Sequence, residues 1–245
     1  MARTIVVTGA SAGIGRKTAE RFLDRGWNVA LIARRGSVLE EMAKAHPAAM
    51  AVPCDVADAA AVDVAFATIA RHFGRIDVLF NNAGIFRPAN LIDDMPIKDW
   101  TDTLDVNLSG MVYAARAAFR QMRAQQPQGG RIINNGSVSA HAPRPGALGY
   151  TVTKHAITGL TKVLALDGRP FDIACGQIDV GNAATELAAS LGQGARQADG
   201  SIRPEPLMDV DHVADAVLQM AELPPSANIL SMVLMATKMP LVGRG

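Results

Sequence analysis

Residues 8 to 15 read Thr-Gly-Ala-Ser-Ala-Gly-Ile-Gly and join a short apolar segment, residues 4–7, to a segment of helical period that contains Ala19 and Phe22. Glycines let the backbone turn tightly and approach a pyrophosphate, whose charge the N–H groups and positive dipole end of the following helix stabilise. A glycine-rich turn also serves packing alone in many proteins. The apolar segment before it and the helix after it favour a nucleotide-binding turn.

Short segments rich in β-branched and apolar residues recur along the rest of the chain and alternate with segments of helical period. We predict seven strands, near residues 4–7, 29–33, 49–52, 78–80, 131–134, 173–178 and 229–234. Parallel neighbours can be reached only through a crossover, so this alternation predicts parallel pairing. The predicted fold is α/β, a doubly wound (Rossmann) and mostly parallel seven-stranded sheet with helices on both faces.

Two of the intervening helices carry clear buried faces. The first lies between the third and fourth strands, with apolar positions at offsets 0, 3, 4, 7, 8 and 11: Val62, Ala65, Phe66, Ile69, Ala70 and Phe73. The second is predicted near the C-terminus, with Asp211 as its N-cap and with Val213, Val217 and Met220 on its buried face.

The chain has 245 residues, of which 49% are hydrophobic and 19% are charged, and its formal net charge is +1. This length and composition are typical of one folded domain, which we place at residues 1–245. Near-neutral charge gives no reason to expect nucleic acid as a partner. No apolar run approaches the roughly 18 residues of a membrane-spanning helix, and no signal peptide is recognisable, so we expect a cytoplasmic protein. Cys54 and Cys175 are expected to be buried thiols, and no metal site is predicted.

The spacing of Gly9, Gly13 and Gly15 is Gly-x-x-x-Gly-x-Gly, which resembles the short-chain dehydrogenase/reductase family. Further matches follow in the order that this family shows, and they cover essentially the whole chain. They are Asp55-Val56, Asn81-Asn82-Ala83-Gly84, Asn107, Ser137, and Tyr150-Thr151-Val152-Thr153-Lys154.

The resemblance implies a nicotinamide cofactor, a catalytic set of Asn107, Ser137, Tyr150 and Lys154, and a homo-oligomer, a tetramer or a dimer, with residues 150–166 in one interface. We expect the following residues to bind the cofactor: Gly9, Ser11, Gly13, Ile14, Gly15, Arg34, Arg35, Asp55, Val56, Asn82, Ala83, Gly84, Tyr150, Lys154, Gly181 and Thr185.

The side chains of this set suit hydride chemistry. Reduction of a carbonyl leaves negative charge on oxygen, which needs a proton donor. Tyr150 and Lys154 are four residues apart on a helix and share a face, so the ammonium is expected to lower the phenol pKa. Ser137 is expected to polarise the substrate oxygen, and Ser139 is the other candidate for this role. By resemblance, Asn107 joins Lys154 through water. Taken singly, each of these residues also has an ordinary structural interpretation.

Two segments depart from the family pattern. Where the family shows Pro-Gly-x-x-x-Thr, this chain has Val180-Gly181-Asn182-Ala183-Ala184-Thr185, so the proline is absent while the glycine and threonine match. By resemblance, Thr185 still binds the nicotinamide carboxamide. The C-terminal residues 235–240 lack the family's frequent Asp-Gly-Gly ending.

The residues at the end of the second predicted strand indicate whether the cofactor is NAD or NADP(H). An NAD site places an acidic residue there, about 20 residues beyond the glycine turn, whereas this chain has Arg34-Arg35 and no carboxylate between Asp24 and Glu40. Guanidinium groups bind a 2′-phosphate, which predicts NADP(H), although solvated charges at a strand end remain the alternative. Ala12 occupies the place of a basic residue that the family also uses, so Arg34 must contribute more to the selectivity.

The predicted function is NADP(H)-dependent hydride transfer between nicotinamide and a small-molecule carbonyl or secondary alcohol. The alternatives are a non-catalytic dinucleotide-binding redox sensor, an NAD-linked alcohol dehydrogenase, or a lyase or epimerase on the same fold. We expect a substrate pocket built from Phe86, Arg87, residues 140–149 and a lid at about residues 186–206. Arg144 or Arg196 either meets an anionic substrate group or is solvated, and solvation is the favoured alternative.

Overall fold

The structure, a computed structural model, describes residues 2–186 and 194–242. Two kinds of strand occur in these residues, those of a central sheet and those of a small hairpin. The strands are β1 (Thr4–Thr8), β2 (Asn28–Ala33), β3 (Ala49–Pro53), β4 (Val78–Asn81), β5 (Gly130–Asn135), β6 (Ile173–Gly181), β7 (Ala195–Arg196), β8 (Ile202–Arg203) and β9 (Ser231–Met235). The α-helices are α1 (Gly13–Asp24), α2 (Gly36–Ala45), α3 (Ala59–Phe73), α4 (Ile97–Leu104), α5 (Gly110–Ala124), α6 (Leu148–Asp167) and α8 (Val210–Glu222).

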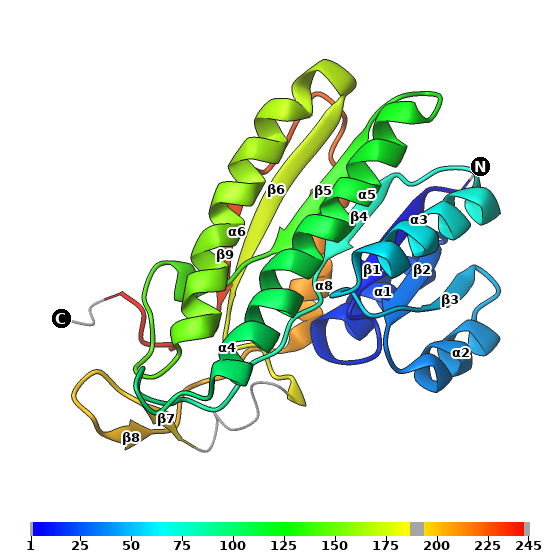
Figure 1. The fold of residues 1–245 in the computed structure, drawn as a ribbon. Helices are drawn as coiled ribbons and strands as arrows, with labels where there is room; N and C mark the ends of the chain where they lie inside the picture. The colour runs from blue at the N-terminus through cyan, green and yellow to red at the C-terminus, as the bar shows by residue number, and fades with distance from the viewer. Residues whose placement is uncertain (1, 187–193, 243–245) are drawn as a thin grey trace.

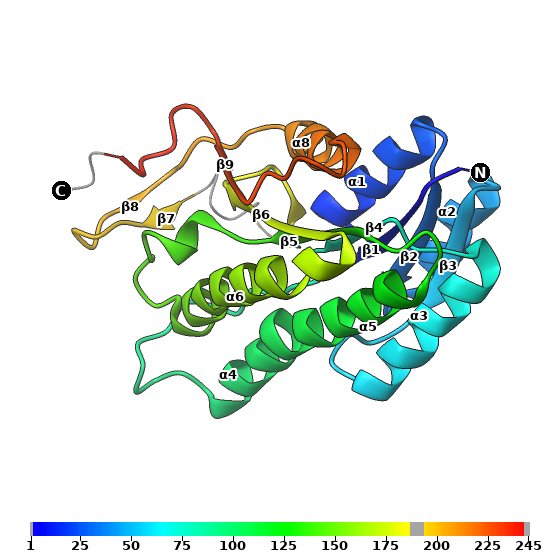
Figure 2. The same cartoon turned by 90° about the horizontal axis from the view of Figure 1, so that it is seen from above.

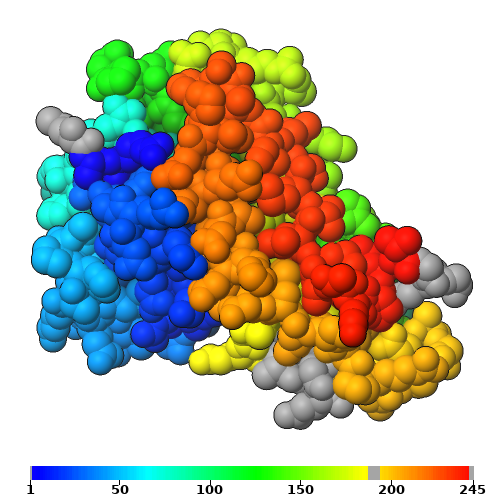
Figure 3. All heavy atoms as spheres, turned by 180° about the vertical axis from the view of Figure 1, so that it is seen from behind, coloured from blue at the N-terminus to red at the C-terminus, as the bar shows by residue number. Residues whose placement is uncertain are grey.

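The central sheet has seven parallel strands in the order β3-β2-β1-β4-β5-β6-β9, and β7 pairs with β8 in a separate antiparallel hairpin (Figure 1). Helices α3, α5 and α6 cover one face of the sheet, and α1 and α8 cover the other (Figure 2). From behind, α8 lies directly beside α1 (Figure 3). The predicted doubly wound fold is confirmed. Strand order reverses between β1 and β4, so a crevice opens at the carboxyl ends of these two strands.

All seven predicted strands are present in the sheet. The last one is shifted, because β9 begins at Ser231 and not at Ile229. The predicted cap of the last helix was wrong: the N-cap of α8 is Asp209, whose side chain accepts a hydrogen bond from the Asp211 backbone N–H at 2.9 Å. The helix starts two residues earlier than expected because Val210 is itself a buried part of its apolar face.

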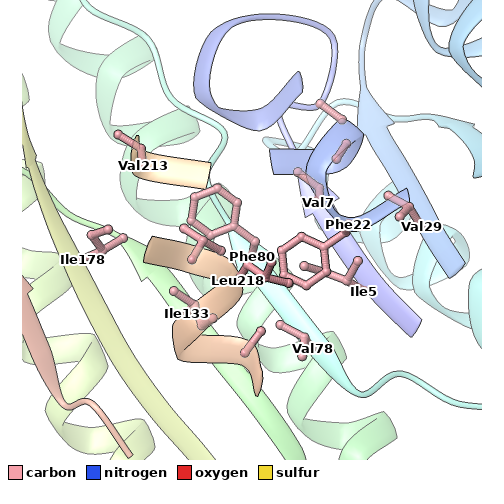
Figure 4. Close-up of a cluster of buried hydrophobic side chains, with 14 of the residues drawn as sticks. Ile5, Val7, Phe22, Val29, Val78, Phe80, Ile133, Ile178, Val213 and Leu218 are labelled. Carbon is pink, nitrogen blue, oxygen red and sulfur yellow. The ribbon is translucent and has the colours of Figure 1, made fainter. Parts of the chain in front are cut away.

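Successive side chains along each strand point to opposite faces of the sheet, and this divides the core into two layers. Ile5 and Val7 of β1 face the cluster under α1 and α8, whereas Val6 faces the cluster under α3 and α5. In the first cluster, Phe22 of α1 and Phe80 of β4 lie with Ile5 and Leu218 (Figure 4). Both predicted helical faces are confirmed as buried or partly buried. Both cysteines are buried, and no helix within the described ranges is long and apolar enough to cross a membrane.

Helix α3 offers a test of local stability that does not touch the crevice. The side chain of its N-cap, Asp58, accepts hydrogen bonds from the backbone N–H groups of Ala60 at 2.9 Å and Ala61 at 3.0 Å. Asp58→Ala should therefore lower the free energy of unfolding by about 1 kcal/mol, measured by urea denaturation. Asp58→Asn retains an acceptor and is the control. Equal losses in the two variants would contradict the capping role.

Candidate active site

A cavity of about 680 Å³ opens at the carboxyl edge of the sheet, where β1, β4, β5 and β6 end. Its lining includes the predicted residues of the glycine turn, of both motifs that follow β3 and β4, and of the Ser-Tyr-Lys set. The members predicted from the sequence are Gly9, Ser11, Gly13, Ile14, Arg34, Arg35, Asp55, Val56, Asn82, Ala83, Gly84, Ser137, Tyr150, Lys154 and Thr185. Segments that are distant in sequence are thus brought together around one space.

The glycine turn has the backbone shape that its sequence predicts. Gly9 and Gly13 have φ values of +70° and +51°, a region that side chains other than glycine rarely adopt. Gly15 does not line the cavity. A Cβ at Gly15 would overlap the carbonyl oxygen of Gly9 and lie 2.6 Å from Nδ2 of Asn82, so this glycine allows the helix to pack tightly under the turn.

A continuous chain of hydrogen bonds links the glycine turn to the catalytic candidates. The Thr8 hydroxyl accepts hydrogen bonds from the backbone N–H groups of Asn82 at 2.8 Å and Ala83 at 2.9 Å, while Asn82 Nδ2 donates to the Thr8 carbonyl at 2.9 Å. Asn135 Nδ2 then donates to Asn82 Oδ1 at 2.8 Å, and Lys154 Nζ donates to the Asn135 carbonyl at 2.7 Å. The chain crosses β1, β4, β5 and α6 and holds their ends in register.

The two arginines after β2 occupy different positions. Arg35 donates from Nε to Ser11 Oγ and from its guanidinium to the Ser11 carbonyl, both at 3.1 Å, which connects the end of β2 to the glycine turn. Arg34 is exposed and also lines the cavity. Two guanidinium groups therefore stand at this end of the cavity, and Arg35 is already oriented by the turn.

Ser137, Tyr150 and Lys154 gather at the other end. Ser137 follows β5, is 5% exposed, and its Oγ accepts a hydrogen bond from the Ser139 backbone N–H at 3.1 Å. Tyr150 and Lys154 lie one turn apart on α6, with Nζ 5.4 Å from the centroid of the tyrosine ring. Phe86 packs edge-on against Tyr150, with ring centroids 5.4 Å apart. The serine that hydrogen-bonds with Tyr150 is Ser137, and Ser139 supports it through its backbone.

Burial is the largest influence on the pKa values of Tyr150 and Lys154. It raises the pKa of Tyr150, and the hydrogen bond with Ser137 acts in the opposite direction. The lowering of the Tyr150 pKa that we expected from the Lys154 ammonium is thus not the dominant effect. Burial lowers the pKa of Lys154 to about 8, while the negative charge of Asp179 acts to raise it. The protonated form of Lys154 therefore still predominates at neutral pH, although less strongly than for an exposed lysine.

Asn107 lies within a π-helical turn, Asp105–Ser109, between α4 and α5. It is fully buried, accepts a hydrogen bond from the Ile85 backbone N–H at 2.7 Å, and donates to the Ile85 carbonyl at 2.8 Å. Its side chain thus shapes the backbone after Gly84 and does not line the cavity. Gly181 also lies outside the lining, close to Met235 and Met239.

The predicted substrate side needs one correction. Arg144 lines the cavity but is not the solvated charge expected from the sequence, because its side chain is 16% exposed and forms two hydrogen bonds with Glu205, at 2.6 and 2.7 Å. Arg144 also donates to Asn182, whose amide in turn donates to Glu205 at 2.8 Å. Burial raises the pKa of Glu205, but the hydrogen bonds from Arg144, Asn182 and Gln197 outweigh it and lower the pKa to about 2.

Of the other residues predicted to contact substrate, some line the cavity and others do not. Phe86 lines the cavity, whereas Arg87 binds Asp102 at 2.6 Å and is absent from the lining among the described residues. Of the predicted lid, residues 187–193 lie outside the described residues, and the described part contains the β7–β8 hairpin and Glu205. Sequence reasoning missed the residues Asn135, Asp179, Asn182 and Glu205, because each acts through partners distant in the chain.

Comparison with known proteins gives a consistent result. A family profile described as short chain dehydrogenase matches residues 3–196. The 3beta-hydroxysteroid dehydrogenase of Mediterraneibacter gnavus is 35% identical over 180 residues, which make up 72% of this chain but only 64% of that protein, less than two thirds of its length.

Solved structures agree along nearly the full length. Serine dehydrogenase complexed with NADP+ has a TM-score of 0.87 at 26% identity, covering 98% of this chain and 97% of that one. The 3-ketoacyl-(acyl-carrier-protein) reductase of Brucella melitensis, complexed with NADH, has a TM-score of 0.84 at 25% identity and covers 96% of each chain. Both similar structures thus hold a nicotinamide dinucleotide, one of each kind.

The tight packing at Gly15 predicts that one added methyl group strongly weakens dinucleotide binding. Gly15→Ala should weaken dinucleotide binding at least tenfold, because the added Cβ overlaps the Gly9 carbonyl and forces the turn to move. Isothermal titration calorimetry with NADPH and NADH measures the loss. Gly159→Ala is the control, since a Cβ there meets nothing within 4 Å. Unchanged affinity in folded Gly15→Ala would show that the turn does not bind the cofactor.

Proposed function

This chain belongs to the short-chain dehydrogenase/reductase family of oxidoreductases, and from that premise we propose that it transfers hydride between NADP(H) and a small-molecule carbonyl or secondary alcohol. The observation that carries the proposal is the meeting of Ser137, Tyr150 and Lys154 with the glycine turn around one cavity. A dinucleotide sensor would need the turn but not the three polar side chains at its other end.

The residues at the dinucleotide end fit a nicotinamide cofactor. The glycine turn presents backbone at positive φ and leaves no room for side chains, as close approach to a pyrophosphate requires. Asp55 and Val56 follow β3 and would border the adenine, and Thr185 would lie at the nicotinamide. The bound cofactor supplies the hydride in reduction and accepts it in oxidation.

The chain's own residues manage the proton. In reduction, Tyr150 donates its phenolic proton to the substrate oxygen as negative charge develops there, and in oxidation it accepts that proton. When substrate is bound, Ser137 donates its hydroxyl hydrogen to the same oxygen, while its Oγ accepts from the Ser139 N–H. The Lys154 ammonium, oriented by the Asn135 carbonyl, stabilises the phenolate left on Tyr150.

Two further features belong to the proposal. Exposed Val152, Val163 and Leu166 on α6 support a homo-oligomer that uses this helix, a tetramer or a dimer. Residues 186–206 are proposed to close over bound substrate. The cytoplasmic location expected from the sequence stays a prediction.

Tyr150→Phe removes one hydroxyl and leaves a ring of the same shape. Turnover should fall by about 10² to 10⁴, the cost typical of losing a general acid, while NADPH affinity stays nearly unchanged. The rate is read from the loss of NADPH absorbance with a panel of ketones, aldehydes and quinones. Tyr113→Phe is the matched control, since the chain has only two tyrosines. Near wild-type rates in the Tyr150 variant would refute the assignment, and a wild type that binds NADPH but turns over nothing would favour the sensor.

The preference for NADPH over NADH tests the proposed role of Arg34 and Arg35. Charge-assisted hydrogen bonds to a 2′-phosphate are worth about 1.5 to 3 kcal/mol, so kcat/KM for NADPH should exceed that for NADH by roughly 10- to 150-fold. Arg34→Ala should remove most of this preference without disturbing the turn that Arg35 holds. Arg71→Ala, another exposed arginine on the far end of α3, serves as the control. Equal use of both cofactors by the wild type would contradict NADP selectivity.

A further inference from the structure

A buried carboxylate lies behind the catalytic candidates and belongs to none of the motifs. Asp179 is near the end of β6 and is 1% exposed. Its Oδ1 accepts hydrogen bonds from the Ser137 backbone N–H at 2.9 Å and from Gln177 Nε2 at 2.7 Å, and its Oδ2 lies 2.9 Å from His141 Nε2. Two of the three partners of this carboxylate, the Ser137 N–H and His141, belong to the segment that follows β5, and the third, Gln177, lies on β6 itself.

The surrounding chain is shaped to admit this carboxylate. A Cβ at Gly136 would overlap Asp179 Oδ1 and would lie 2.7 Å from Gln177 Nε2. Gly136 itself donates its backbone N–H to the Ile178 carbonyl at 2.8 Å, which fixes β5 beside β6 at this point. Glycine before the catalytic serine is therefore required by the acid on the neighbouring strand.

Two elements contribute titratable side chains near Asp179. His141, after the short helix η2 (Val138–Ala140), faces its Oδ2 and has a half-exposed side chain. Lys154 of α6 interacts with Asp179 through its charge, and the negative charge favours the protonated lysine. The Ser137 backbone N–H and the Gln177 amide complete the polar groups that contact the carboxylate. Burial alone would disfavour the Lys154 ammonium, so an acid in this place opposes that penalty.

We propose that Asp179 is a positioning residue of the proposed oxidoreductase site, whose buried carboxylate fixes the backbone of Ser137 and balances the charge of the Lys154 ammonium. The inference rests on the proposed function. It assigns to β6 a role in proton transfer that the Ser-Tyr-Lys motif does not contain. The carboxylate acts through Ser137 and Lys154 and does not line the cavity among the described residues.

The charge role can be measured without turnover. The chain has six lysines, so ¹³Cε-lysine labelling gives a simple NMR spectrum, in which Lys154→Arg identifies the Lys154 signal. In Asp179→Asn the amide oxygen still accepts from Ser137, but the charge is gone. The midpoint of the Lys154 titration, near 8 in the wild type, should fall by about one pH unit. Asp77→Asn, which neutralises a partly buried carboxylate at the opposite edge of the sheet, should leave it unchanged.

The same variants are then assayed for carbonyl reduction against pH. The alkaline limb of kcat/KM should move to lower pH in Asp179→Asn by the same amount, because Lys154 loses its proton earlier. A uniform loss of rate at every pH, with an unmoved Lys154 midpoint, would overturn the charge role. If Asp179→Asn does not fold, Asp179→Ser, a smaller neutral acceptor, takes its place.

The two hypotheses fail in different ways. Absence of turnover in the wild type on every carbonyl tested counts against the proposed function, and the lysine titration still decides the electrostatic role of Asp179. Turnover in the wild type, together with unchanged titration and pH profile in Asp179→Asn, counts against Asp179 alone.

Discussion

The hydrogen bonds between Thr8 and the segment after β4 are the contact on which the rest of the site depends. They join the carboxyl ends of β1 and β4, the two strands between which the order of the sheet reverses. The chain leaves these strands toward opposite faces, so a crevice must open there. Thr8 is fully buried, and its hydroxyl oxygen accepts hydrogen bonds from the N–H groups of Asn82 and Ala83 in place of water.

The same contact places the residues proposed to transfer the proton. From Asn82 the hydrogen bonds continue through Asn135 to Lys154, so the ammonium position is determined by the sheet edge and not by the helix alone. A buried network of this kind is costly when one member is unpaired, because each orphaned group loses its hydration without compensation. The polar side chains at the sheet edge therefore act as one unit that binds the glycine turn at one end and orients helix α6 at the other.

Charge is distributed unevenly along the cavity. Among the described residues, no carboxylate forms an ion pair with Arg34 or Arg35 at the end of the cavity beside the glycine turn, which suits an anionic ligand. At the end of the cavity that holds Tyr150, Glu205 neutralises Arg144, and Phe86 packs on Tyr150. An arginine that is paired with a carboxylate attracts a further anion less than an unpaired arginine does. The positive charge open to a ligand is therefore concentrated at the end of the cavity that holds Arg34 and Arg35.

The sequence by itself determined the alternation of strands and helices, the glycine turn and the order of the motifs, because these depend on local periodicity and on residues that are close along the chain. Through the resemblance to the family, the sequence also indicated most of the residues that line the cavity, from Gly9 to Thr185, although Gly15, Asn107 and Gly181 lie outside its lining. Tertiary structure alone decided the pairing of Arg144 with Glu205, 61 residues apart, and of Ser137 with Asp179, 42 apart. No local pattern marks such partners, because an arginine or an aspartate reads the same whether it is solvated or paired. Burial is likewise a property of the assembled fold, and it is burial that brings the pKa of Lys154 to about 8.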